Sequence, residues 1–143
     1  MARSRRDPLE FLETYGAMRR ALTALAQGNY TEHGIGVLQA KCIRWIGEAG
    51  SISQAALARR IETDPALTGR ALGTLVERGW VKRERSDVDR REYVLSLSPS
   101  GKRMQDKVER ARHELAAKVI AALDDSDVED FERVARKLIA AFT

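Results

Sequence analysis

All three prolines of this 143-residue chain directly follow a residue type that caps helices. The three pairs are Asp7-Pro8, Asp64-Pro65 and Ser98-Pro99. Proline fits the first position of a helix but breaks its interior, and an Asp or Ser before it accepts hydrogen bonds from the free amides of the first turn. Each pair therefore predicts where a helix begins, and we expect no helix to run across any of them.

Apolar residues recur at helical spacing in six segments, and each is expected to be a helix with a buried face. We expect helices over residues 7–28, 36–48, 54–60, 65–78, 99–123 and from 126 onward, the last opened by the capping box Ser126-Asp127-Val128-Glu129. In the segment 65–78 the spacing turns Leu67, Ala71, Leu72 and Leu75 inward. The segments 54–60 and 65–78 are joined by a short connection, which is typical of a helix-turn-helix unit.

After Gly79 the period of the pattern shortens from 3.6 to about 2, which indicates strands. Residues 80–85 and 92–97 are predicted to pair as a hairpin around a charged tip. A helix-turn-helix followed by such a hairpin predicts a mainly α fold with a small β-wing, a winged helix-turn-helix. We expect this core at about 36–97, within a single domain of residues 1–143.

The flanking segments, residues 7–28 and 98–143, carry apolar stripes that lie far in sequence from the central unit. Leu12 and Leu22 belong to the first stripe, and Phe131 and Leu138 to the last. Self-association is the simplest way to bury such stripes, so we expect these segments to be the dimerisation helices of a homodimer. The alternative is that the first and last helices pack only on each other.

Composition excludes several classes of protein. Cys42 is the single cysteine, so no intrachain disulfide can form, and no apolar run approaches the ~20 residues of a membrane helix. The basic start, residues 1–6, precedes no apolar stretch and does not indicate a secretory signal, so a cytoplasmic location without membrane contact is expected. Metal-ligand clusters, nucleophile motifs and glycine-rich phosphate loops are absent from the sequence. We therefore expect no enzyme, no cofactor and no bound metal.

Basic residues concentrate around the predicted hairpin. Residues 78–91 hold six of them against three acids, in a chain of net charge +4, which is typical of a polyanion binder. An α-helix fits the major groove of DNA, so the outward face of the helix 65–78 is expected to read bases. On that face Arg70 can contact a guanine edge, and Ala66 can contact a thymine methyl. Thr68 and Thr74 can bond to a phosphate or a base.

In the hairpin, an arginine at the tip can enter a narrow minor groove. We expect Asp89 to orient Arg91 for this role. The full set of expected DNA-binding residues is Ser53, Gln54, Ala66, Thr68, Gly69, Arg70, Thr74, Arg83, Arg85, Asp89, Arg90 and Arg91. Each prediction has an alternative that stays open. Arg70 could be an ordinary solvated residue, and the charges of the hairpin could serve only to discourage aggregation of a sheet edge.

Five motifs follow one another along the chain: Ser53-Gln54-Ala55-Ala56-Leu57-Ala58, Asp64-Pro65, Leu75-Val76-Glu77-Arg78-Gly79-Trp80-Val81, Asp89-Arg90-Arg91 and Leu95-Ser96-Leu97-Ser98-Pro99-Ser100-Gly101. Together they resemble the MarR family of bacterial regulators, and the resemblance covers nearly the whole chain. It implies a dimer on a pseudo-palindromic operator of double-stranded DNA, with residues 65–78 as recognition helix. The family's D-x-R wing motif falls on Asp89 and Arg91. The chain departs from the family at Gly73 and Thr74, where many members carry an acid and then a base.

The resemblance also implies a repressor that releases DNA when a small phenolic or other aromatic effector enters a cleft beside the dimer helices. The candidate ligand contacts are Tyr15, Met18, Arg19, His33 and Trp45, although ordinary packing or a turn explains Tyr15, His33 and Trp45 as well. Some relatives of the family sense oxidation through a cysteine, which makes Cys42 an alternative sensor, but its apolar neighbours favour simple packing. A further alternative is a winged helix that contacts proteins and has no affinity for DNA.

Overall fold

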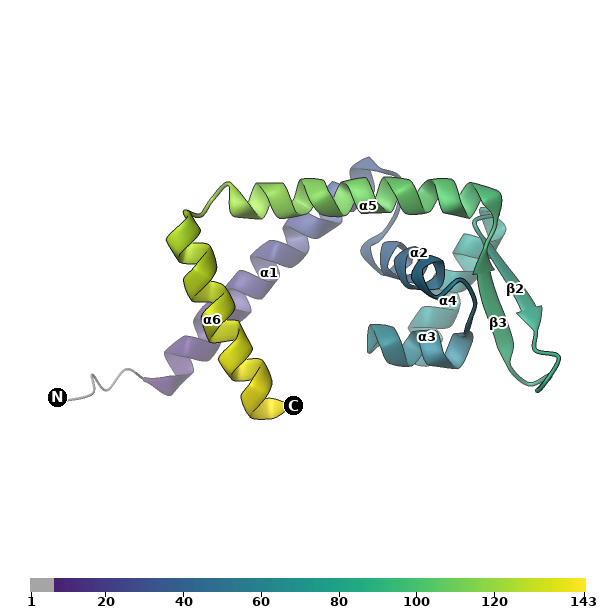
Figure 1. Cartoon of the computed structure of the whole chain (residues 1–143), viewed down its shortest axis with the longest axis horizontal. Helices are drawn as coiled ribbons and strands as arrows, with labels where there is room; N and C mark the ends of the chain where they lie inside the picture. The colour runs from purple at the N-terminus through teal and green to yellow at the C-terminus, as the bar shows by residue number, and fades with distance from the viewer. Residues whose placement is uncertain (1–6) are drawn as a thin grey trace.

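Six helices and a three-stranded sheet are formed by residues 7–143, the part of the chain that the computed structural model describes (Figure 1). The helices are α1 (Pro8–Glu32), α2 (Val37–Ala49), α3 (Gln54–Ile61), α4 (Pro65–Glu77), α5 (Pro99–Ile120) and α6 (Asp125–Phe142). The strands are β1 (Ile52–Ser53), β2 (Val81–Arg85) and β3 (Tyr93–Leu97). Residues 1–6, where we expected no secretory signal, lie outside the described residues.

All three proline pairs open a helix, as predicted. The Asp7 carboxylate accepts a hydrogen bond from the Leu9 amide at 3.0 Å. Asp64 accepts from the amides of Ala66 and Leu67 at 2.7 and 3.3 Å, and the Ser98 hydroxyl accepts from Gly101 at 3.0 Å. These side chains satisfy amides that have no partner inside the helix, which fixes the starts of α1, α4 and α5.

The sheet is antiparallel with the strand order β1-β3-β2. The predicted hairpin is present, and its register pairs Val81 with Leu97 and Arg85 with Tyr93. The sequence did not predict β1, in which Ile52 pairs with Leu95, because two residues carry no periodicity. Ser53 ends this strand and also caps α3, where its hydroxyl accepts from the Ala56 amide at 3.1 Å.

A single apolar core joins α2, α3, α4, the sheet and the first half of α5. Its fully buried side chains include Ile43, Ile46, Leu57, Leu72, Leu75, Leu95 and Val108. The start of α5 packs so closely on the end of the wing that a Cβ at Gly101 would clash with the Trp80 carbonyl oxygen. We call residues 29–115, which contain this core, the head.

Helix α1 is longer than the sequence indicated. We expected it to end near Gly28 and Asn29, but it runs to Glu32, and both Asn29 and Tyr30 are buried. The Asn29 side chain donates to the Ala111 carbonyl at 2.7 Å and accepts from Lys118 at 3.1 Å. Contacts with α5 therefore outweigh the weak helix propensity of Gly and Asn.

The last helix begins slightly earlier than the predicted capping box at Ser126. Asp124 is the N-cap and accepts from the Asp127 amide at 2.8 Å. The Asp127 carboxylate in turn accepts from the Asp124 amide at 3.1 Å. The same reciprocal chemistry is present two residues upstream of the predicted position, because Asp serves both roles as well as Ser and Glu do.

Residues 8–28 and 116–142, which we call the arm, extend away from the head (Figure 1). No residue of α6 is buried, so the alternative that the first and last helices simply pack on each other does not cover these stripes. The arm exposes large apolar side chains that include Leu9, Phe11, Leu12, Leu22, Phe131, Val134, Leu138 and Phe142. Within residues 7–143, no helix has the length and apolar character needed to span a bilayer.

Candidate nucleic-acid interface

The exposed face of α4 begins immediately after its cap. Ala66, Leu67 and Arg70 are exposed, while Gly69 and Thr74 are partly buried. The chain enters α4 through a tight connection in which Glu62 has a left-handed conformation with φ of 58°. Arg70 is thus presented to solvent from a helix that packs on the head through its opposite face, as a reading residue requires.

The predicted orientation of Thr68 is wrong. We expected it to face outward and Leu67 to face the core, but Thr68 is 0% exposed and Leu67 is 45% exposed. The Thr68 hydroxyl donates to the Asp64 carbonyl oxygen at 3.2 Å, which satisfies it inside the core. Apolar residues occur on both sides of this turn, so the pattern alone did not define which face is buried.

Two arginines of the wing lie against an aromatic ring. Arg83 and Arg85 point to the same face of β2, and their guanidinium carbons lie 4.9 and 4.4 Å from the Tyr93 ring centroid. Arg85 also donates to the Arg90 carbonyl oxygen at 2.8 Å. These contacts stiffen the hairpin while both side chains keep their charge at its surface.

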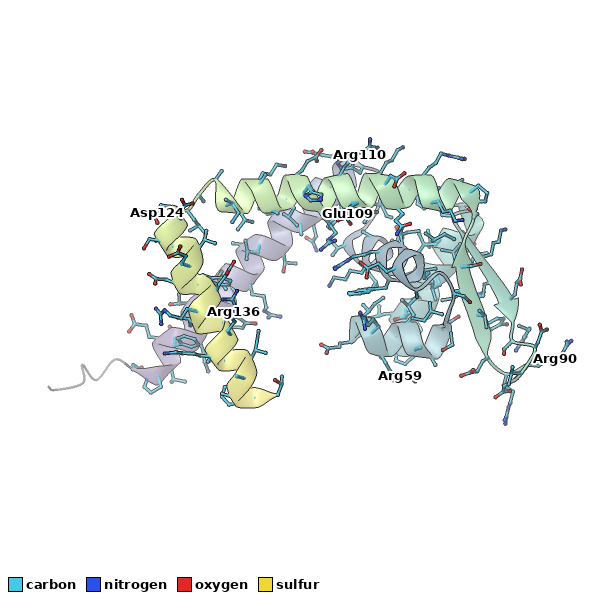
Figure 2. The ribbon with its side chains drawn as sticks, viewed as in Figure 1. Arg59, Arg90, Glu109, Arg110, Asp124 and Arg136 are labelled. Atoms are coloured by element: carbon cyan, nitrogen blue, oxygen red, sulfur yellow. The ribbon has the colours of Figure 1, made fainter. Side chains whose placement is uncertain are left out.

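The expected contact between Asp89 and Arg91 is present. One Asp89 carboxylate oxygen accepts from the Arg91 amide at 3.1 Å and from its Nε at 3.2 Å. Ser86 supports the turn by accepting from the Asp89 amide at 3.3 Å. The Arg91 side chain is 92% exposed, and Figure 2 shows Arg90 pointing away from the molecule at the end of the hairpin. The tip therefore presents two arginines, one of them held by a carboxylate.

The wing and α3 border a common hollow of about 580 Å³. Gln54, Arg59, Arg91 and Tyr93 are among its lining residues. Ser53 and Gln54 are both partly buried, and the Ser53 hydroxyl is engaged in capping α3. The Gln54 Oε1, in contrast, is buried and has no hydrogen-bond partner among the described residues.

Arg78 has a role that the sequence did not reveal. We counted it among the basic residues of the hairpin, but its guanidinium donates to the Gly34 carbonyl oxygen at 2.7 Å. It also lies over the Trp80 ring, 4.9 Å from the centroid. Gly34 belongs to the connection between α1 and α2, so Arg78 links the end of α4 to this connection within the head.

The five candidate ligand residues lie on three separate parts of the chain. Tyr15 and Met18 are exposed on the arm, as is Arg19. His33 follows α1 and contacts the Glu114 carboxylate at 3.0 Å. Trp45 lies on α2, and the guanidinium carbons of Arg44 and Arg60 lie 4.4 and 4.2 Å from its ring centroid. Within one chain they do not form a shared site.

Cys42 is buried in the core of the head. Burial raises the pKa of its thiol to about 12, because a thiolate would lose its solvation there. A thiol with so little thiolate reacts slowly with oxidants. The structure therefore favours the packing interpretation of Cys42 over a redox sensor. In addition, no cluster of His, Cys, Asp or Glu that could hold a metal ion occurs in residues 7–143.

A capped helix-turn-helix with an exposed arginine, followed by an arginine-tipped hairpin, defines a winged helix-turn-helix protein. The MarR family model matches residues 37–93. An uncharacterised HTH-type transcriptional regulator of Mycobacterium leprae is 30% identical over 105 residues, covering 73% of this chain and 73% of that protein. The HTH-type transcriptional regulator BilQ of Clostridium symbiosum is 24% identical over 120 residues, 84% and 83% of the two chains. The chain belongs to the MarR family of transcription regulators.

Solved structures share this fold over nearly the full length of the chain. A mutant MarR from E. coli complexed with operator DNA has a TM-score of 0.78 at 22% identity, covering 92% of this chain and 94% of that one. A putative MarR-like transcription regulator from Bacillus cereus has a TM-score of 0.84 at 17% identity, covering 94% and 99%. The likeness in fold therefore extends beyond the central unit to the arm.

Proposed function

We propose that this chain binds a specific double-stranded DNA sequence as a homodimer. Helix α4 lies in the major groove with Arg70 at the bases, and the wing brings Arg90 and Arg91 to the adjacent minor groove. The observation that carries the proposal is the geometry of Arg91. Its side chain is 92% exposed, yet Asp89 holds it in position beside the recognition helix. The MarR of E. coli, whose structure includes operator DNA, has the same fold.

The exposed apolar stripes of the arm support the proposed homodimer. Its apolar side chains stay exposed in one chain, and a second copy with the same stripes is the simplest cover for them. Two-fold symmetry then presents two heads to one duplex, which favours a pseudo-palindromic site with half-sites about one helical turn, ~10 bp, apart. Binding at such a site in a promoter represses transcription by excluding the polymerase.

Release of DNA by a small aromatic effector is the finer part of the proposal. A hollow of about 610 Å³ lies between α1, α2 and α4, and its lining includes Lys41 and Arg70. These two cations suit an anionic aromatic molecule. Because Arg70 also belongs to the reading face, a molecule held there would compete with DNA for the same guanidinium. This support favours the hollow over the five scattered residues that the sequence indicated.

Binding can be tested with duplexes selected from a random pool and titrated at several salt concentrations. The affinity should fall steeply with salt, because binding releases cations from the phosphates. Arg91→Ala should weaken binding about tenfold or more and leave the unfolding temperature unchanged, since the side chain supports no other part of the fold. Arg110→Ala, which removes an arginine on the outer side of α5, is the matched control and should bind normally (Figure 2).

The competing function is a winged helix that binds proteins only. It predicts that selection enriches no duplex and that weak binding is equal for the native protein and Arg91→Ala. Either result would reject the proposal.

The effector is tested with the same duplexes, by screening aromatic carboxylates for release of DNA from the complex.

A further inference from the structure

The arm leaves the head where the end of α1 crosses α5 (Figure 1). These two helices are the ones that continue from the head into the arm, at residues 28–29 and 115–116. The contact between α1 and α5 at this crossing therefore sets the angle between the arm and the head.

A buried amide lies in this crossing. Within residues 7–143, two polar side chains are buried, Asn29 and Thr68. Thr68 bonds within its own turn, whereas Asn29 bonds to another helix. The Asn29 nitrogen donates to the Ala111 carbonyl oxygen at 2.7 Å, and its oxygen accepts from Lys118 Nζ at 3.1 Å. Ala111 belongs to the head and Lys118 to the arm, so one side chain ties α1 to α5 on both sides of the boundary.

Such a contact restricts an angle more than apolar packing does. Apolar surfaces that tilt or slide exchange one set of contacts for another, but a buried amide that loses its partners stays unpaired in a site without water. A single buried Asn selects one register of packed helices for this reason. His33 and Glu114 also join the two helices, but this contact lies at the surface and is therefore weaker. Asn29 is thus the side chain that most restricts the crossing.

We propose that Asn29 is a positioning residue that fixes the angle between arm and head and so restricts the homodimer to one separation of half-sites. The inference rests on the proposed function, because it assumes two heads on one duplex. One added base pair moves a half-site by about 3.4 Å and turns it by about 35° around the duplex axis. A head held at a fixed angle cannot follow both displacements, whereas a head on a loosened crossing can.

The first test measures the distance between the two heads without DNA. Arg59 is exposed on α3, on the side of the head opposite α5 (Figure 2), so a spin label attached through Arg59→Cys reports this distance. The label is introduced into a chain that carries Cys42→Ala. Pulsed dipolar spectroscopy should give one narrow distribution of distances for this protein. Asn29→Leu, which keeps a branched side chain but removes both hydrogen bonds, should give a broad distribution.

The second test measures affinity for duplexes in which the two selected half-sites are moved apart by one base pair. The native protein should lose on the order of 10²-fold, because its second head no longer engages the duplex. Asn29→Leu should lose about tenfold or less, and its affinity for a single half-site should equal that of the native protein. A merely structural role would lower affinity at both separations alike and leave their ratio unchanged.

Lys118→Met provides a second variant in case Asn29→Leu does not fold. Lys118 is exposed, and its substitution removes one of the two hydrogen bonds of Asn29. This variant should broaden the distance distribution, whereas Lys118→Arg, which keeps a donor, should not. Lys107→Met is the matched control, because it removes an exposed lysine from the part of α5 that lies in the head. It should leave both measurements unchanged.

The role of Asn29 is overturned if the native protein and both variants show the same distance distribution, or the same loss of affinity at the changed separation. A native protein that sediments as a monomer, or that selects no duplex, rejects the proposed function itself. The two failures are distinguishable because the first leaves a dimer that binds a specific duplex.

Discussion

Thr68 shows how a polar side chain is accommodated in the core of the head. It is 0% exposed, and its hydroxyl finds an acceptor one turn earlier in the same helix, at the Asp64 carbonyl oxygen. That carbonyl also accepts the Thr68 amide at 3.0 Å, so the hydroxyl adds a second bond to an acceptor that is already satisfied. The side chain therefore contributes to stability through packing and a weak hydrogen bond, and DNA cannot reach it.

Thr68→Val keeps the shape of this side chain and removes its hydroxyl. We expect the free energy of unfolding to change by about 1 kcal/mol or less, because the lost bond is shared. Urea titration measures this change. Affinity for DNA, and its dependence on salt, should equal those of the native protein. A variant that keeps its stability but loses DNA affinity would contradict the burial of Thr68.

Cys42 should be almost inert towards a thiol reagent in the folded protein and react rapidly after unfolding, since its pKa is raised to about 12 by burial. The same shift has a consequence for stability. In the unfolded chain the thiol ionises near its ordinary pKa of 9.0, whereas in the folded chain it stays protonated up to about 12. Ionisation thus favours the unfolded state progressively as pH rises through this window.

Urea midpoints measured between pH 8 and pH 11 should therefore fall, and fall less steeply for Cys42→Ala. The Cys42→Ala variant also loses stability because it leaves a small cavity. Comparing how the urea midpoint changes with pH, rather than its value at one pH, cancels this loss. Tyr30, whose pKa burial also raises, should account for part of the remaining slope. Rapid labelling of the native protein would restore Cys42 as a candidate sensor.

At the scale of elements, the wing combines charge with a fixed geometry. Asp89 places a negative charge beside the surface that we expect to meet phosphates, which on charge alone weakens binding. Its carboxylate also accepts two hydrogen bonds from Arg91, which hold the arginine in position. Whether a substitution of Asp89 strengthens or weakens DNA binding therefore tells whether charge or geometry dominates.

Asp89→Ala should weaken DNA binding about two- to fivefold, the scale of an exposed ion pair, although it removes a negative charge. Asp87→Ala is the matched control at the same tip, where Asp87 is exposed and has no ion pair with an arginine of residues 7–143. It should bind DNA as well as the native protein or slightly better. If both substitutions strengthen binding equally, Asp89 does not position Arg91.

Arg78 joins two elements and should act differently from an arginine that contacts phosphate. Arg78→Gln removes its charge, its hydrogen bond to Gly34 and its contact with Trp80. We expect weaker DNA binding because the end of α4 is no longer tied to the connection between α1 and α2. The dependence of affinity on salt should keep its slope, whereas each lost phosphate contact lowers that slope by about 0.9. A lower slope would identify Arg78 as a phosphate contact.

At the scale of the molecule, the head contains its own core and the arm does not. No residue of α6 is buried within the chain, so α6 adds little to the stability of a single head. The arm therefore makes its contribution in the assembled protein, where burial of the stripes fixes the separation of the two heads. Affinity for a two-part site then depends on the arm even though no arm residue is expected to touch DNA.

Leu138→Glu places a charge in the middle of the apolar stripe of α6. Sedimentation at micromolar concentration should show a dimer for the native protein and a monomer for this variant. Affinity for a full pseudo-palindrome should fall to that for one half-site, while the unfolding transition of the head persists. Arg133→Glu, on the opposite side of α6, is the control and should remain dimeric. A native protein that sediments as a monomer would reject the two-headed arrangement.

Features that depend only on neighbouring residues were predictable before the fold was known. Asp64 caps α4 through amides two and three residues away, and Asp89 reaches Arg91 two residues away, so both were predictable from spacing. The wing was evident because the period changes at Gly79. Interactions of this kind form within one turn and do not depend on the rest of the fold.

Which face of a helix is buried, and which distant groups bond to each other, depended on the packing of the complete chain. Leu67 and Thr68 exchanged their expected places because the packing of the whole head, rather than the apolar pattern of α4, selects the buried side. Asn29 lies inside α1, and its side chain donates to the carbonyl of Ala111, 82 residues away. Arg78 likewise donates a hydrogen bond to the carbonyl of Gly34, 44 residues away. Such contacts exist only once the chain has folded, since spacing along the sequence carries no information about them.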